Sequence, residues 1–117
     1  MGDRGNVRII STATDVGDIY FYTHWHGSDL QTIVASAIAS PEGRNRWHDE
    51  AYLNRIIFER MLDNASDREH GFGIAPYEVD SGELITVNHA NKTMTFGRIE
   101  LSFTHVVEIM AEMSAIL

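Results

Sequence analysis

Three segments of this chain place apolar residues at the spacing of a single helix face, and shorter alternating segments lie before and between them. Each such face must be buried against another layer, which the alternating segments supply as a sheet. The spacing predicts helices near residues 29–40, 49–62 and 103–116. Their apolar stripes are Leu30, Ile33, Val34, Ala37 and Ile38; Leu53, Ile56, Ile57 and Met61; and Val106, Val107, Met110, Met113 and Leu117.

The alternating segments predict strands that pair mainly in antiparallel hairpins. They are residues 7–11, 18–25, 71–74, 84–88, 93–96 and 99–103. Because the chain has 117 residues, a single core is the norm for it. We therefore predict one α+β domain over residues 1–117, with a mainly antiparallel sheet and about three helices packed on one face.

The composition excludes several classes of function. The chain has no cysteine, which rules out disulfides, thiolate catalysis and thiolate-bound zinc or iron–sulfur sites. Its 17 acidic and 9 basic residues give a net charge of −8, so direct nucleic-acid binding is not expected. An acidic decoy that occupies the nucleic-acid site of another protein is an alternative that suits this charge. The sequence has neither a run of about 18 apolar residues nor a signal-peptide pattern, which predicts a cytoplasmic protein without membrane contact.

The segment from Thr23 to Leu30 (THWHGSDL) is predicted to join a strand to the first helix. Such junctions often hold anions, metals or catalytic groups. Ser28 stands where its hydroxyl would cap the amide of Gln31 in an S-x-x-Q capping box. The alternative is an anion cradle formed by the free amides at this helix start, with which the Ser28 cap and the charge of Asp29 compete.

His24 and His26 lie two positions apart, so on a strand both rings would project from the same face. Together with a third histidine or a carboxylate, this spacing suits a divalent metal ion. A metal-dependent hydrolase that uses these two histidines is therefore one candidate function. In the other interpretation both rings are ordinary polar members of a sheet face, and the protein holds neither a metal nor a cofactor.

A second cluster, Arg44-Asn45-Arg46-Trp47-His48-Asp49-Glu50, combines two arginines, an aromatic ring and a histidine. Its guanidinium groups and indole ring suit a phosphate and a stacked base. Alternatively, Arg46 pairs with an acidic neighbour and Trp47 fills the core. A first helix of about 12 residues would hold this cluster roughly 18 Å from the Thr23–Leu30 junction. One site would unite both clusters only if the loop folds back or a second subunit contributes one half.

Several stretches of the chain stand out together, namely Met1–Val7 (MGDRGNV), Tyr20–Leu30 (YFYTHWHGSDL), Arg44–Phe58 (RNRWHDEAYLNRIIF) and Gly71–Ile74 (GFGI). In these stretches the chain resembles a group of small uncharacterised proteins from actinobacteria, archaea and their phages. The resemblance implies no particular activity. In that group glycine usually stands at the position of His26, which weighs against the two-histidine metal site.

We expect a non-enzymatic binding protein that recognises a small anionic, nucleotide-like ligand or a partner protein. No complete set of catalytic residues accompanies the polar clusters, so the metal-dependent hydrolase and the acidic decoy are the alternatives. The large aromatic side chains exceed what one small core can bury, which predicts a homodimer. The residues expected to line a small-ligand site are His24, Trp25, Ser28, Arg44, Arg46 and Trp47.

Overall fold

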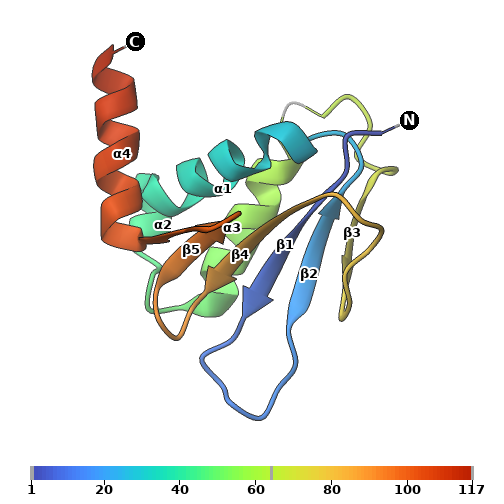
Figure 1. The fold of residues 1–117 in the computed structure, drawn as a ribbon, viewed down its shortest axis with the longest axis horizontal. Coiled ribbons are helices and arrows are strands. Elements are labelled where there is room, and N and C mark those ends of the chain that lie inside the picture. Colours follow the sequence, from blue (N-terminus) through green and yellow to red (C-terminus); the bar gives the residue numbers. More distant parts are fainter. Residues whose placement is uncertain (1, 64, 117) are drawn as a thin grey trace.

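One six-stranded sheet organises the fold (Figure 1). Its strands are β1 (Gly5–Ile10), β2 (Ile19–Thr23), β3 (Phe72–Ala75), β4 (Glu83–Asn88), β5 (Thr93–Phe96) and β6 (Ile99–Ser102). The structure is a computed structural model that describes residues 2–63 and 65–116, with side chains described up to Ser114. Leu117, which ends the third predicted stripe, lies outside the described residues.

The first strand lies at the centre of the sheet, because the strand order is β3-β2-β1-β4-β5-β6. Four of the five neighbouring pairs are antiparallel, and β1 pairs with β4 in parallel from Gly5–Glu83 to Ile10–Asn88. The prediction of a mainly antiparallel sheet is therefore confirmed. The parallel pair joins the N-terminal and C-terminal parts of the sheet.

Helices lie where the apolar stripes predicted them. They are α1 (Leu30–Ala39), α3 (Glu50–Leu62) and α4 (Phe103–Ile116). Asp49 accepts a hydrogen bond from the Tyr52 amide at the start of α3, and Ser102 accepts one from the His105 amide at the start of α4. Within the part of the chain that the structure describes, no helix is both long and apolar enough to cross a membrane.

A short helix that the spacing did not predict, α2 (Pro41–Arg44), follows α1 directly. The Ser40 hydroxyl caps it by accepting a hydrogen bond from the Gly43 amide, 3.0 Å away. Proline at the first helical position is favourable, because that position needs no amide donor. This helix places Arg44 and the residues after it at the C-terminal end of α1.

A single apolar cluster joins one face of the sheet to the helices. On β1, Val7 and Ile9 are buried whereas Arg8 between them is not, as the two-residue period of a strand requires. The α+β class, with helices packed against the sheet, is confirmed. The buried members of the cluster are Val7, Ile9, Phe21, Leu30, Val34, Ala37, Ile38, Leu53, Ile56, Ile57, Met61, Ile85, Val87, Met94, Phe103 and Val106.

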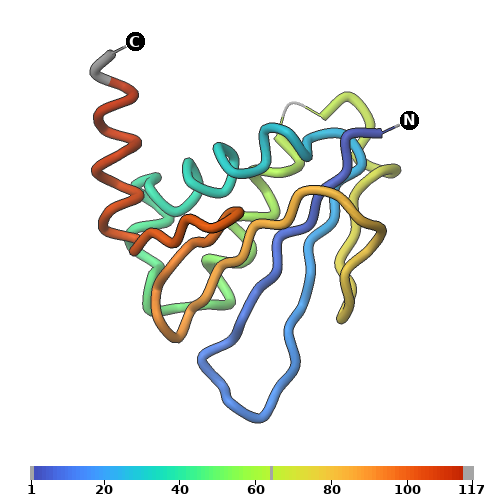
Figure 2. The backbone as a smooth tube through the Cα atoms, in the orientation of Figure 1, coloured from blue at the N-terminus to red at the C-terminus, as the bar shows by residue number. Residues whose placement is uncertain are grey.

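Helix α4 packs on the domain mainly through its first turns. Phe103 and Val106 are buried in the core, but Met113, two turns later, is 44% exposed. Figure 2 shows the helix extending past α1 and away from the body of the domain. The later turns of α4 therefore present apolar side chains to solvent.

Candidate functional site

Strand β2 ends at Thr23, where the threonine hydroxyl accepts hydrogen bonds from the amides of Trp25 and His26, both at 3.2 Å. These bonds turn the chain out of the strand direction. The prediction that His24 and His26 project from one strand face is therefore wrong. Thr23 was the signal that could have shown this, because threonine favours local bonds to the backbone.

The two histidine rings lie in different surroundings. His24 Nδ1 lies 2.9 Å from the Tyr22 hydroxyl, and the ring packs edge-on against Trp25 with 4.5 Å between centroids. The His26 ring stacks on Phe72, with 6.0 Å between centroids. Among the described residues, no group of three or more His, Asp or Glu side chains could hold a metal ion. The geometry gives the hydrolase interpretation no support.

The Tyr22 hydroxyl holds the His24 ring in place through the contact with Nδ1. It lies 3.4 Å from the Asp80 carboxylate as well as beside the imidazole. Burial and the charge of Asp80 raise the pKa of Tyr22, so the phenol keeps its proton. Asp80 itself has a φ of 52°, an unusual conformation for a residue with a side chain. Neither Tyr22 nor Asp80 is among the site residues predicted from the sequence.

The carboxylate of Asp3 occupies the turn before the first helix. Both oxygens lie 3.0 Å from the Ser28 amide nitrogen, and the Ser28 hydroxyl donates to the same group at 2.5 Å. The hydroxyl bond, followed by the amide bond, lowers the pKa of Asp3. The predicted Ser28 capping box is wrong, because Ser28 lies inside a 3₁₀ turn and the N-cap of α1 is Asp29. The chain's own carboxylate fills the predicted anion cradle.

Trp25 is exposed yet held in place. It is 49% exposed, and its indole nitrogen donates a hydrogen bond to the carbonyl oxygen of His70 at 3.4 Å. Gly71, with a φ of 84°, lies so close that a Cβ atom there would overlap the indole nitrogen. The edge of His24 contacts the same ring. His24 and Gly71, which both lie in the quoted sequence stretches, therefore set the orientation of Trp25.

A cavity of about 300 Å³ opens beside Trp25, lined also by His26, Ala65, Ser66 and Asp67. The ionised state of its one carboxylate is stabilised by hydrogen bonds. The Nδ1 of His70 lies 2.9 Å from the Asp67 carboxylate, and this hydrogen bond is the largest cause of the lowered pKa of Asp67. The amides of Glu69 and His70 donate two further bonds to the same carboxylate. The cavity thus combines a fixed aromatic ring with a negatively charged group.

Trp47 is partly buried and packs against the core. Its indole nitrogen donates to the carbonyl oxygen of Ile38 at 3.0 Å, and its ring lies 5.5 Å from that of Phe103. Arg46 Nη1 lies 3.9 Å from the Asp49 carboxylate. Of the two interpretations that the sequence offered for this cluster, the structure shows the one in which Arg46 pairs with Asp49 and Trp47 contributes to packing.

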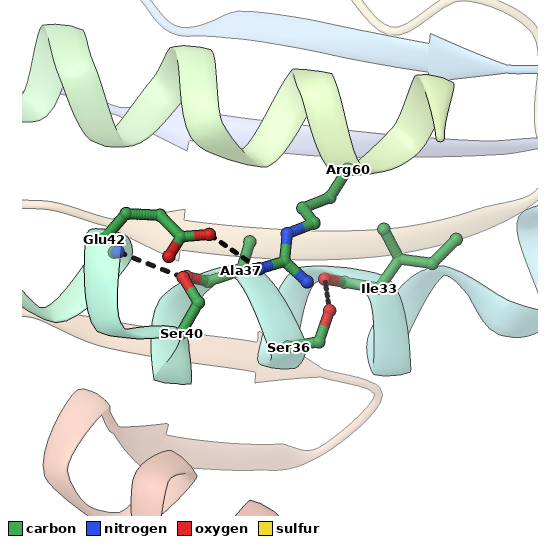
Figure 3. A network of polar contacts seen from close by, with 7 residues as sticks. Ile33, Ser36, Ala37, Ser40, Glu42 and Arg60 are labelled. Carbon is green, nitrogen blue, oxygen red and sulfur yellow. Dashed lines mark hydrogen bonds and ion pairs between the residues drawn. The ribbon is translucent and has the colours of Figure 1, made fainter. Parts of the chain in front are cut away.

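A charged cavity of about 530 Å³ lies between α2 and α3. Arg60 on α3 reaches Glu42 on α2 (Figure 3), with 2.8 Å between the paired atoms. Arg55 pairs with Glu59 on the same helix at 2.5 Å. The charged residues that line the cavity are Arg46, Arg55, Arg60, Glu42, Glu59 and Asp63. Three positive and three negative side chains cancel, so an entering anion would compete with carboxylates already in place.

The structure does not bring the two predicted clusters into one pocket. Trp25 and Ser28 precede α1, whereas Arg44 and Arg46 follow it, and its ten residues span about 15 Å. The cavity beside Trp25 and the cavity that contains Arg46 share no lining residue. Within one chain, the interhelix segment does not fold back to the junction.

An apolar groove between α1 and α4, of about 160 Å³, was not predicted from the sequence. Met94, Phe96 and Leu101 from β5 and β6 form its floor. The remaining lining residues are Gln31, Thr32 and Ala35 of α1 and Val106, Ile109, Met110 and Met113 of α4. The feature of the sequence that could have predicted this groove is Ile109, which makes the apolar face of the third helix wider than contact with the core requires.

His89 is a buried histidine at the end of β4 that the sequence analysis also missed. It is 1% exposed, its Nε2 donates to Asn54 Oδ1 at 2.7 Å, and its Nδ1 has no partner among the described residues. Burial lowers the pKa of His89, and the nearby Glu50 opposes that shift. Glu50 in turn accepts bonds from the Ser11 hydroxyl at 2.7 Å and the Thr12 amide at 2.9 Å. These contacts fasten the β1–β2 turn to α3.

Compared with known proteins, the chain matches no protein-family model, no curated protein and no solved structure. The resemblance to actinobacterial, archaeal and phage proteins stays a prediction. Function has to be inferred from the surfaces themselves.

Proposed function

We propose that this chain is a protein-interaction module whose α1–α4 groove binds an amphipathic helix of a partner protein. The observation that carries the proposal is the uncharged lining of this groove. Among the described residues ten line the groove, and none of these ten carries a charged side chain, although 22% of the residues in the chain are charged. Grooves with such linings receive the apolar face of a helix in many recognition complexes.

The walls of the groove suit an elongated apolar partner. Helix α4 extends past α1 (Figure 2). Its exposed Met113 carries the apolar lining of the groove into this later part of the helix. Met94, Met110 and Met113 line the groove, and methionine side chains adapt to apolar surfaces of varied shape. Exposed apolar surface beside a preformed groove is typical of a binding face.

The charge of the surrounding helices favours a basic partner. Neither α1 nor α4 contains a lysine or an arginine, and α4 carries Glu108 and Glu112. In the predicted homodimer a second copy, also with a net charge of −8, would bring further negative charge to the groove. A helix with Lys or Arg beside its apolar stripe is attracted instead. We infer that the occupant is a basic amphipathic helix.

The small anionic ligand expected at Arg44 and Arg46 is the weaker proposal. Arg46 has a carboxylate neighbour and stacks 4.4 Å over the ring of Tyr52, and the cavity that it lines is balanced in charge. The groove presents no such competition, because its lining has no ionic pair to break.

Methyl NMR on protein labelled with ¹³C at its methionine methyl groups tests the proposal. Met94, Met110 and Met113 report on the groove, and Met61, which is fully buried in the core, is the internal control. Two synthetic peptides share leucines at i, i+3, i+4 and i+7 and carry either lysines or glutamates beside them. We expect the lysine peptide to shift the methyl signals of the groove methionines and to leave the Met61 signal unchanged. It should bind at least about tenfold more tightly than the glutamate peptide.

Two variants separate the groove from general apolar adhesion. Met113→Glu places a charge in the groove and should abolish the peptide-induced shifts. Ile74→Glu is the matched control, because Ile74 is 58% exposed on the strand at one edge of the sheet and does not line the groove. The proposal is overturned if neither peptide shifts the groove signals at millimolar concentration. It is also overturned if Met113→Glu converts a dimer, seen by analytical ultracentrifugation, into a monomer, because the occupant is then a second copy.

A further inference from the structure

The cavity beside Trp25 points to a second binding site, independent of the groove. We infer that it binds a nucleoside, with the base stacked on Trp25 and the ribose hydroxyls bound by Asp67. The cavity, of about 300 Å³, lies at the lower end of the range for small-molecule pockets. It lies before the N-terminus of α1, whereas the groove lies between α1 and α4.

Trp25 is a rigid platform for a flat ring. An exposed tryptophan normally loses side-chain freedom when it binds, and that loss reduces affinity. Here the ring is already fixed by the carbonyl oxygen of His70, by the edge of His24 and by Gly71, while half of its surface stays exposed. The ordering of the ring is complete before any ligand arrives. Stacking of a base on an aromatic side chain depends little on the identity of the base.

The polar lining selects hydroxyl groups. A carboxylate accepts about four hydrogen bonds, and the backbone and ring donors of Glu69 and His70 supply three to Asp67. One acceptor position is thus left for a ligand hydroxyl, as in the binding of ribose hydroxyls by acidic side chains elsewhere. Ser66 adds a hydroxyl that both donates and accepts.

The same lining disfavours a phosphate. The five lining residues that the structure describes include no arginine and no lysine, and the charge of Asp67 would repel an anion. The ligand class is therefore a nucleoside rather than a nucleotide. This proposed ligand differs from the anionic ligand expected from the sequence and keeps Trp25 in the site.

Indole N–H signals in ¹H–¹⁵N NMR spectra test this assignment on the full chain. The chain has two tryptophans, of which Trp25 lines the cavity and Trp47 donates to the core carbonyl of Ile38. Adenosine is the probe, with 2′,3′-dideoxyadenosine, AMP and methyl β-glucoside as comparisons. We expect adenosine to shift the Trp25 signal and leave that of Trp47, and to bind about tenfold more tightly than the dideoxy analogue.

Variants then assign the two halves of the ligand. Trp25→Ala should abolish binding of both nucleosides, detected by line broadening of the ligand itself. Asp67→Asn should weaken adenosine and leave the dideoxy analogue unchanged, a pattern that general loosening of the loop would not produce. The inference is overturned if adenosine leaves Trp25 unmoved at millimolar concentration, if AMP binds more tightly than adenosine, or if the glucoside alone shifts Trp25.

Discussion

Asp3 and Ser28 are joined by three hydrogen-bond contacts across 25 positions of sequence, two to the Ser28 amide and one from its hydroxyl. The bonds fasten the chain before β1 to the turn that begins α1. The two segments lie so close together that position 27 requires glycine, because a Cβ atom there would overlap the carbonyl group of Arg4. The segment before β1 and the turn before α1 therefore pack against each other.

The Asp3→Asn variant should have a lower urea midpoint than the parent protein at pH 7, because an amide accepts fewer and weaker hydrogen bonds. The pKa of Asp3 is depressed below its ordinary value of 3.8, so its contribution to stability is present above that value. It is lost as the pH falls through the lower, folded-state value. Urea titrations at pH 7 and about pH 2.5 check this, and a difference that persists undiminished at the acid pH would contradict it.

Replacing Trp47 with alanine should lower the free energy of unfolding by about 3 kcal/mol, because the partly buried ring packs against the core beside Phe103. Trp47→Phe should cost less, about 1–3 kcal/mol, since mainly the bond to Ile38 is lost. Arg46→Ala serves as the control and should cost at most about 1 kcal/mol, because its contact with Asp49 is long and exposed. Chemical denaturation measures all three. A reversed order would place Trp47 outside the core.

His89 should make the protein less stable as the pH falls below neutrality. Burial depresses its pKa in the folded state below the ordinary value of 6.5, so the unfolded chain binds the proton first. Stability is full above that value and declines as the pH falls toward the folded-state value. His89→Gln removes the titrating group and keeps a donor for Asn54. Between about pH 7.5 and 5.5 the unfolding free energy of this variant should change less than that of the parent protein. An equal slope for both proteins would contradict the expectation.

Gly71→Ala should destabilise the protein by about 1 kcal/mol or more and displace Trp25. Its φ of 84° disfavours a side chain, and the added Cβ atom would meet the indole nitrogen. Gly17→Ala is the matched control, because nothing lies within 4 Å of a Cβ atom at that position. Thermal unfolding measures the stability, and the indole N–H signal of Trp25 in ¹H–¹⁵N NMR spectra reports the displacement of the ring. Equal effects of the two substitutions would contradict this role for Gly71.

The sequence predicted the layers of this fold well because their determinants are local. Spacing such as Leu30, Val34 and Ile38 defines a helix face without reference to the rest of the chain. The pairing of β1 with β4 could not be predicted this way, because it depends on contacts between distant segments. The prediction of a Ser28 cap for the first helix failed for the same reason: Asp3, from another part of the sequence, binds the Ser28 hydroxyl that the prediction assigned to the amide of Gln31.

The candidate site was predicted in part. Trp25 was chosen for its residue type and place at a strand end, and it lines a cavity. Ala65, Ser66 and Asp67, which complete that cavity, lie in a polar segment with no periodicity to suggest a role. The arginine cluster was chosen by composition, but composition does not reveal that Glu42, Glu59 and Asp63 line the same cavity as Arg46.

The place of β1 in the sheet has a consequence for biosynthesis. The strand is complete at Ile10 and gains β2 as a neighbour by Thr23, but its other neighbour, β4, is complete only at Asn88. At usual elongation rates a ribosome needs roughly 3–13 s to translate the codons in between. Throughout that interval one side of β1 is an unpaired edge, able to join a strand from another nascent chain. Chaperone dependence and inclusion-body formation should therefore track the speed of translation between β2 and β4 more closely than the stability of the finished fold.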